Sequence, residues 1–152
     1  MPLHGEYAPS PSDWARKQAE AFEASGGTEA NTLRGVPIIL LTSVGARSGK
    51  LRKTPLMRVE HAGTYAAVAS TRGGDRHPDW YANVLAHPRV TLRDGNLVLE
   101  LVAREVTGAE RSRWWSLACT VFPSYVDYQR RTRRRIPVLL LEQAPEGGSR
   151  TA

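Results

Sequence analysis

Hydrophobic positions along the chain predict six β-strands. Val36 to Leu41 form an apolar run that is typical of a strand buried on both faces. Thr64 to Ser70 form a second apolar run that is poor in bulk, and such a strand lets another element or a ligand pack closely against it. The other predicted strands are one that ends at Glu60 and three that cover residues 89–94, 96–106 and 136–141.

Four helical segments are predicted around these strands, over residues 13–25, 78–86 and 108–121 and from residue 124 onwards. Ser12 or Asp13 can cap the first helix, and Pro78 suits the first position of the second. Thr107 and Glu110 have the spacing of a capping box at the start of the third.

The turns between strands indicate an antiparallel sheet. Asp94-Gly95 is a strong tight-turn signal, and the neighbouring strands are also joined by short turns. Six antiparallel strands in a small domain favour a barrel, so the sequence predicts an α+β fold with one domain over residues 13–143. Residues 1–12 hold three prolines and no periodicity, which predicts a flexible arm. Residues 144–152 are rich in Pro, Gly and Ser, which predicts a disordered tail.

The charge of the chain indicates an affinity for anions. The 152 residues carry a formal net charge of +6, so phosphates, carboxylates, nucleic acid and anionic membrane surfaces are all candidate partners. Cys119 is the only cysteine, which excludes an intrachain disulfide and fits a reducing compartment. The sequence has no apolar run of about 18 residues and no apolar signal-peptide core, so we expect a cytoplasmic protein.

The segment Gly45-Ala46-Arg47-Ser48-Gly49-Lys50 contains two glycines, a hydroxyl and two cations. Arg52 and Lys53 follow it directly. Free backbone N–H groups, a serine hydroxyl and basic side chains are the groups that bind an anion. On this loop alone, an ordinary hairpin turn with solvated charges is the simpler interpretation.

Searches for catalytic motifs exclude several classes of enzyme. The sequence has no cysteine pair or H-E-x-x-H for a metal, no G-x-S-x-G elbow and no G-x-G-x-x-G after a strand. The basic run Arg130 to Arg135 suits nucleic acid or anionic lipid, but no aromatic residues alternate with its arginines. We therefore interpret it as a solvated helix end, expect no nucleic-acid partner, and keep weak contact with an anionic membrane surface as an alternative. Any catalysis is expected to rely on a bound cofactor.

Three segments, GARSGKLRKTPL, AVASTRGGDRHPDWYANVLAHP and FPSYVDYQ, resemble the deazaflavin-dependent nitroreductase family. The resemblance covers about residues 13–142, and the three motifs occur in the same order as in that family. It implies a split β-barrel of the FMN-binding type and a reductase that uses reduced coenzyme F-420. The expected reaction is hydride transfer to a quinone, a nitro compound or an activated alkene.

The resemblance also implies roles for individual residues. Tyr125 and Ser70 are the expected catalytic positions, with Tyr125 placing or protonating the substrate over the deazaflavin ring. Arg47, Ser48, Gly49 and Arg52 match the loop that holds the phosphate and poly-glutamate tail of the cofactor. The remaining cofactor-binding positions implied are Lys53, Thr54, Pro55, Leu56, Met57, Val68, Ala69, Ser70, Thr71, Trp80, Tyr81 and Asn83.

Two departures from the family pattern concern the substrate more than the cofactor. Phe122 stands where relatives carry a tyrosine, and Thr71 replaces a common lysine, for which Arg72 can compensate. Two alternatives remain open at this point: a split barrel that binds FMN or haem, and a non-catalytic carrier of the deazaflavin. The sequence leaves the assembly as a monomer or a homodimer.

Overall fold

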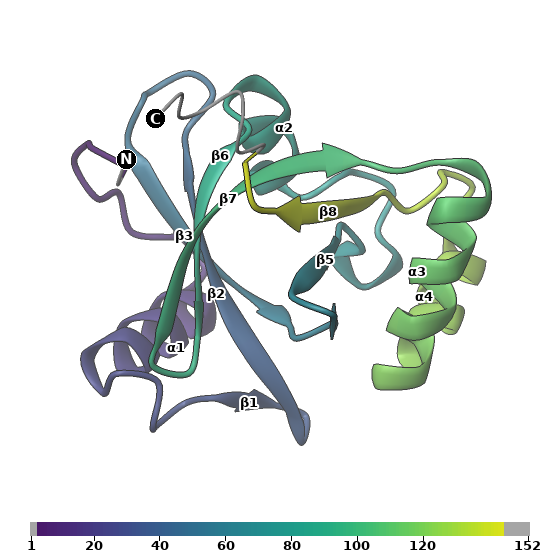
Figure 1. The fold of residues 1–152 in the computed structure, drawn as a ribbon, viewed down its shortest axis with the longest axis horizontal. Coiled ribbons are helices and arrows are strands. Elements are labelled where there is room, and N and C mark those ends of the chain that lie inside the picture. Colours follow the sequence, from purple (N-terminus) through teal and green to yellow (C-terminus); the bar gives the residue numbers. More distant parts are fainter. Residues whose placement is uncertain (1–2, 145–152) are drawn as a thin grey trace.

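A computed structural model describes residues 3–144 (Figure 1). Residues 3–144 contain four helices and one 3-10 turn: α1 (Asp13–Ala24), η1 (Thr71–Gly73), α2 (Asp79–Ala86), α3 (Gly108–Val121) and α4 (Ser124–Arg131). The strands are β1 (Thr32–Leu33), β2 (Val36–Val44), β3 (Leu51–Met57), β4 (Glu60–His61), β5 (Thr64–Val68), β6 (Arg89–Asp94), β7 (Leu97–Glu105) and β8 (Val138–Glu142). None of the described helices is long and apolar enough to cross a membrane.

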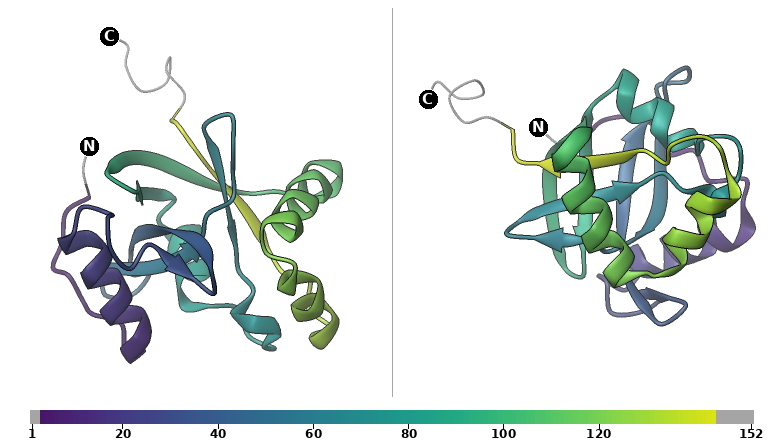
Figure 2. Two further views of the ribbon diagram at one scale, coloured as in Figure 1. Left: turned by 90° about the horizontal axis from the view of Figure 1, so that it is seen from below. Right: turned by 90° about the vertical axis from the view of Figure 1, so that its right-hand side faces the viewer.

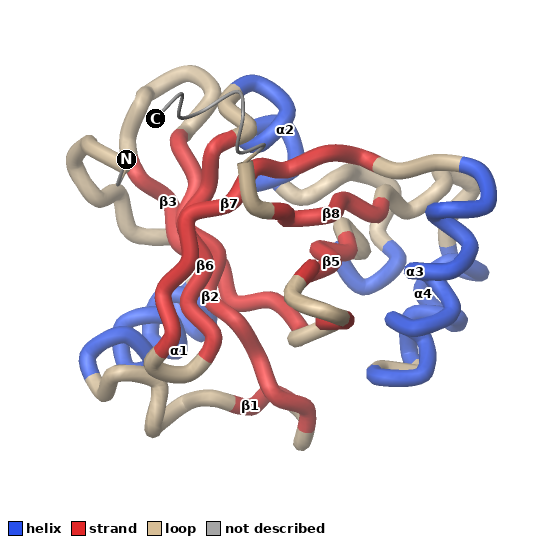
Figure 3. Tube along the Cα trace, viewed as in Figure 1, coloured by secondary structure: helices blue, strands red, loops and turns tan. Residues whose placement is uncertain are grey.

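The strands form one curled sheet in which every pairing between them is antiparallel (Figure 3). Their order is β1-β2-β6-β7-β8-β5-β4, and β3 pairs with β2 off this path. Figures 1 and 2 show α1 and the α3–α4 pair at opposite ends of the molecule. The predicted antiparallel α+β architecture is therefore confirmed.

The predicted strand that ends at Glu60 is in fact two strands. β3 ends at Met57, where the Arg58 N–H still donates to the Pro37 carbonyl at 2.9 Å. Glu60 and His61 then form the first strand of a separate hairpin with β5. This division and the two-residue β1 explain why the described part of the chain has eight strands where about six were predicted.

The capping box predicted from Thr107 and Glu110 is absent. Thr107 occupies the N-cap position of α3 but makes no side-chain cap hydrogen bond. The Glu110 carboxylate instead accepts hydrogen bonds from Arg104 Nη1 at 3.0 Å and Nη2 at 2.9 Å, which lowers the pKa of Glu110. Ser12 at the N-cap of α1 likewise makes no side-chain cap hydrogen bond. The first turns of α1 and α3 are therefore stabilised by contacts other than N-caps.

The central part of β2 is buried on both faces, as predicted for the run 36–41. Alternate residues of β2 belong to two separate core clusters, Ile38 and Leu40 to one and Ile39 and Leu41 to the other. The first cluster also contains residues of α1, α3 and α4, whereas the second contains Trp80 and Val84 of α2. The helix α2 therefore packs on the opposite face of β2 from α1, α3 and α4.

The predicted arm, residues 1–12, contacts β3 within its described part. The Leu51 N–H donates to the Glu6 carbonyl at 2.8 Å, and the Ala8 N–H donates to the Leu51 carbonyl at 2.9 Å. Of the predicted tail, residues 145–152 lie outside the described residues.

Replacing Gly27 with alanine is expected to destabilise the fold, because Gly27 packs directly on the β6–β7 turn. A Cβ at Gly27 would lie 2.2 Å from the Gly95 carbonyl oxygen, and the φ of Gly27 is +88°. We expect Gly27→Ala to cost about 2–5 kcal/mol, from a left-handed residue plus overpacking. Gly26 has a φ of +66°, and a Cβ added there would meet no atom within 4 Å, so Gly26→Ala is the matched control. Equal costs in urea unfolding would contradict this packing argument.

Candidate functional site

An apolar cavity of about 230 Å³ lies between α1, the β1–β2 turn, β3, the η1 loop and α4. The predicted site residues that line it are Thr54, Pro55, Leu56, Met57, Val68, Ser70, Thr71, Trp80 and Tyr125. These residues come from segments that are far apart in the sequence, and the fold brings them to one enclosure.

A groove of about 710 Å³ adjoins the apolar cavity, and Pro78 lines both. The predicted residues Arg47, Ser48, Arg52, Tyr81 and Asn83 line this groove. A third hollow, of about 230 Å³, shares Arg52 and Asn83 with the groove and Thr54 and Trp80 with the cavity, and Lys53 also lines it. The three spaces therefore adjoin one another, with the apolar cavity next to a groove that Arg47 and Arg52 line.

The Gly45–Lys50 loop in this groove is held by its own hydrogen bonds. Gly45 N–H donates to the Lys50 carbonyl at 2.8 Å, and Lys50 N–H donates to Ser48 Oγ at 3.1 Å. The Ala46 N–H donates to Asn83 Oδ1 of α2 at 2.9 Å. A Cβ at Gly45 would lie 2.6 Å from Ser48 Oγ, so a larger residue here would displace the Ser48 hydroxyl. The expectation of free backbone donors is wrong for these three N–H groups, which leaves anion binding mainly to the side chains.

The cations of the loop differ in how they are neutralised. Lys50 lies 3.7 Å from a Glu6 carboxylate oxygen, and Lys53 pairs with Glu23 of α1. Arg47 and Arg52 make no ion pair with any residue in the range 3–144. Asp79 also lines the groove and offsets part of its charge. The two arginines are therefore the groove cations best able to bind an external anion.

Two predicted residues do not line the described cavities. Gly49 is exposed at the end of the loop, with a φ of +71° that favours glycine. The Ala69 side chain is fully buried in the core cluster that contains α2, on the other side of the sheet from Val68. Ala69 nevertheless contributes through its backbone, because its carbonyl accepts a hydrogen bond from Arg134.

Arg134 holds the segment that leads from β5 to α2. Its Nη1 donates to the Ala69 carbonyl at 3.1 Å, its Nη2 to the Ser70 carbonyl at 2.8 Å, and its Nε to the Gly74 carbonyl at 2.8 Å. Further bonds reach Thr71 Oγ1 at 2.7 Å and His77 Nδ1 at 2.9 Å, so the imidazole proton is on Nε2. Partial burial lowers the pKa of Arg134.

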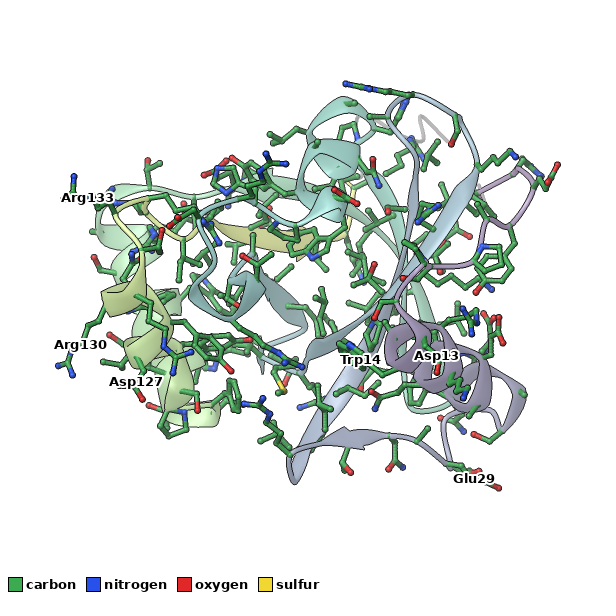
Figure 4. All side chains as sticks on the ribbon, turned by 180° about the vertical axis from the view of Figure 1, so that it is seen from behind. Asp13, Trp14, Glu29, Asp127, Arg130 and Arg133 are labelled. Atoms are coloured by element: carbon green, nitrogen blue, oxygen red, sulfur yellow. The ribbon has the colours of Figure 1, made fainter. Side chains whose placement is uncertain are left out.

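This finding corrects the interpretation of the basic run. α4 ends at Arg131, and Arg134 lies in the following loop as a half-buried structural cation. Figure 4 shows Arg130 and Arg133, in contrast, directed outward at the far edge of the molecule. No local signal distinguishes Arg134 from the arginines beside it.

The segment that Arg134 holds has an unusual backbone. Thr71 and Arg72 have φ values of 42° and 55°, and Gly73 follows with 82°. Two successive non-glycine residues in the left-handed region store strain, and surrounding contacts must maintain it. A Cβ at Gly73 would lie 2.6 Å from the Tyr128 carbonyl oxygen, so the loop packs closely on α4.

Tyr125 belongs to an aromatic cluster at the wall of the cavity. Its ring centroid lies 5.1 Å from that of Phe122, 6.1 Å from Trp115 and 6.2 Å from Tyr128. Burial raises the pKa of the Tyr125 phenol well above its ordinary value. Its hydroxyl has no hydrogen-bond partner among the described residues, whereas the Tyr128 hydroxyl accepts a bond from Arg34 Nη1 at 3.0 Å.

The two aromatic residues at the start of α2 differ in exposure. Trp80 is buried and lines the cavity, whereas the Tyr81 hydroxyl donates to Glu105 Oε1 at 2.6 Å. Burial and this bond raise the pKa of Tyr81 to about 12. Within residues 3–144, no group of three or more His, Cys, Asp or Glu side chains could hold a metal ion.

Comparison with known proteins identifies relatives of this chain. The model of a family described as F420H(2)-dependent quinone reductase matches residues 14–143. An F420H(2)-dependent quinone reductase of Mycobacterium tuberculosis is 31% identical over 124 residues, which cover 79% of this chain and 83% of the relative.

Solved structures give the same picture. An F420-H2 dependent reductase has 52% identity and a TM-score of 0.67, with 70% of this chain and 94% of that chain covered. A domain-swapped dimer has 48% identity and a TM-score of 0.70, with 88% and 100% covered. A haem-binding protein of Mycobacterium smegmatis has a TM-score of 0.55 at 14% identity and shares the fold alone. These likenesses confirm the predicted split-barrel fold.

Proposed function

The chain belongs to the F420H(2)-dependent quinone reductase family, and we propose that it reduces a quinone with reduced coenzyme F-420, the F420H(2) of the family description. A quinone gains one hydride and one proton and becomes a hydroquinone. Nitro compounds and activated alkenes are proposed as further acceptors, because they also take a hydride followed by a proton.

The single observation that carries this proposal is an apolar cavity that adjoins a groove lined by Arg47 and Arg52. A deazaflavin cofactor consists of a flat ring and a long anionic tail, so it needs both environments in contact. Arg47 and Arg52 have no ion-pair partner among the described residues and suit the phosphate and carboxylates of the tail. Val68 and Ser70 offer small side chains against which a flat ring can lie. The residues present therefore fit the cofactor.

We assign roles to the chain's own groups on this basis. When bound, reduced coenzyme F-420 supplies the hydride. Ser48 and the two arginines hold the anionic tail, while Thr54 to Met57 and Trp80 bound the ring site. Arg134 fixes the carbonyls of Ala69 and Ser70 and thereby orients the segment that faces the ring. Holding two reactants in contact accounts for most of the rate enhancement that such a reaction requires.

Two alternative functions are tested by the same experiment. Haem-binding neighbours share only the fold with this chain, so they give no support for a haem or flavin site. We expect a fluorescence titration to show tight binding of coenzyme F-420 and weak binding of FMN. Reduced coenzyme F-420, and not NADPH, should then drive the reduction of menadione. Binding without turnover of any quinone would favour a carrier, and tight FMN binding would favour a flavoprotein.

Replacing Arg52 with glutamine is expected to weaken binding of coenzyme F-420 by about 1–3 kcal/mol, because a charge-assisted bond to phosphate is lost. The loss should be smaller for a deazaflavin fragment without the anionic tail. Lys50→Gln removes the same charge from a lysine that is paired with Glu6, and it is the matched control. An equal loss for cofactor and fragment would refute the assignment of the tail site.

We also propose a cytoplasmic homodimer. The single Cys119 suits a reducing compartment, and a 48% identical chain forms a domain-swapped dimer. Light scattering of the purified chain tests the assembly, because a monomeric mass at micromolar concentration would contradict it.

A further inference from the structure

We propose that the natural acceptor carries an anionic group, a carboxylate or a sulfonate-like acid, which Arg34 and Arg72 bind at the apolar cavity. This inference rests on the proposed function and adds the chemical class of its substrate. Neither arginine belongs to the cofactor loop or to the groove that adjoins it.

The charge of the cavity wall is the first argument. Arg34 and Arg72 both line the cavity, and none of the lining residues is Asp or Glu. Neither arginine forms an ion pair with a described residue. The other lining groups are apolar, aromatic or hydroxyl-bearing. Two uncompensated cations beside an apolar enclosure favour an aromatic ligand with a negative charge.

The two arginines are held by neighbouring groups. Arg34 lies at the β1–β2 turn and donates from Nη1 to the Tyr128 hydroxyl at 3.0 Å. The Arg72 loop packs on the same residue, because a Cβ at Gly73 would lie 2.6 Å from the Tyr128 carbonyl oxygen. The Arg72 guanidinium also stands 5.8 Å from the ring centre of Trp14 of α1. Tyr128 thus contacts both the Arg34 side chain and the loop that carries Arg72, and both arginines line the cavity.

The remaining donors define what these arginines can bind. Arg34 uses one N–H of its five on Tyr128, and the planar fork of a guanidinium matches a carboxylate or sulfonate in two parallel bonds. Arg72 is exposed and stacked near Trp14, where a planar acceptor can lie against the indole. The pair is therefore suited to hold the acid group of an anionic quinone whose ring lies beside the ring site in the cavity.

The test compares two quinones of similar shape, 1,4-naphthoquinone-2-sulfonate and the neutral menadione. With reduced coenzyme F-420 saturating, kcat/KM is measured for both acceptors in the wild type, Arg34→Gln, Arg72→Gln and the double variant. The ratio of sulfonate to menadione cancels effects shared by both acceptors. We expect this ratio to fall about tenfold in each single variant and further in the double variant, because a charge-assisted bond is lost each time.

Arg133→Gln is the matched control, because it removes one charge from an exposed arginine that points away from the molecule (Figure 4). This control should keep the ratio within about twofold of wild type. If Arg34→Gln folds poorly, Arg34→Lys is measured as a second variant. It keeps the positive charge, so it should keep most of the preference for the sulfonate over menadione. A ratio that is unchanged in the double variant, or that falls equally in Arg133→Gln, would overturn the inference.

A binding measurement separates this inference from the proposed function. If neither quinone is reduced, the proposed function fails. The anionic subsite is then tested by calorimetric titration of the wild type and the double variant with 1,4-naphthoquinone-2-sulfonate. A Kd about tenfold or more weaker in the double variant supports the anionic subsite. Equal Kd values refute it.

Discussion

Arg134→Leu is expected to be the most damaging single substitution at this site. Its guanidinium donates to three carbonyls, one hydroxyl and one imidazole, all in the segment between β5 and α2. Removal leaves partly buried acceptors without partners, at about 1–3 kcal/mol for each buried acceptor. It also releases Thr71 and Arg72 from their left-handed conformations. We expect a loss of about 3–5 kcal/mol in unfolding free energy and at least a hundredfold weaker binding of coenzyme F-420.

Urea unfolding and fluorescence titration measure these two losses. Arg134→Lys retains the charge but not the fork of donors, so it should fall between wild type and Arg134→Leu. Arg133→Leu changes the adjacent, exposed arginine and should alter both quantities by less than about 0.5 kcal/mol. If Arg134→Leu stays folded and binds the cofactor as tightly as wild type, the segment does not depend on Arg134.

Local signals predicted most of the fold correctly. Asp94-Gly95 indicated a hairpin, and β6 and β7 do pair from Arg89–Val102 to Asp94–Leu97. The apolar run 36–41 indicated a strand buried on both faces, and its alternate residues do enter two core clusters. Such features depend on neighbours in the sequence or on periodicity, so one chain is enough to predict them.

Features that depend on distant partners could not be predicted in the same way. Arg134 bonds to residues that precede it by 57 to 65 positions, and the run of arginines around it carries no mark of this role. Glu110 has the capping-box spacing, but the fold brings Arg104 close to it, and the Glu110 carboxylate accepts hydrogen bonds from this arginine instead. The break between Met57 and Glu60 likewise follows from pairing with β5, which the local pattern does not encode.

In the candidate site, too, residues of a local motif could be predicted and residues that depend on distant partners could not. Arg47, Ser48 and Arg52 were recognised from a short motif, and the fold places all three in one groove. Arg34 was not assigned a site role, because it is an ordinary turn residue in the sequence, and Arg72 was considered only as a substitute for a lysine at position 71. Their shared cavity becomes evident only when Tyr128 brings the β1–β2 turn and the η1 loop together.

The second large effect concerns the hydroxyl of Tyr125. Tyr125→Phe keeps the aromatic bulk in the cluster with Phe122 and Trp115, so stability and cofactor affinity should change little. Tyr125 is buried and lines the cavity, and its hydroxyl has no hydrogen-bond partner among the described residues, so we expect this hydroxyl to be available to the acceptor. We expect kcat to fall about ten- to a hundredfold, in the range of a lost positioning hydrogen bond.

The direction of the pKa shift favours positioning of the acceptor by Tyr125 over its protonation. Burial raises the pKa of the phenol, so the folded protein keeps it protonated as the pH rises through its ordinary value of about 10. A raised pKa also makes the phenol a weaker acid, and we therefore expect it to orient the acceptor while solvent supplies the proton. Deprotonation of Tyr125 should then cause no loss of kcat in the wild type up to about pH 10. A modest solvent isotope effect on kcat should be equal in the wild type and in Tyr125→Phe. Tyr128→Phe is the companion variant, since its hydroxyl is bonded to Arg34. Unchanged turnover of several acceptors in the Tyr125→Phe, Tyr128→Phe double variant would show that neither hydroxyl contributes to catalysis.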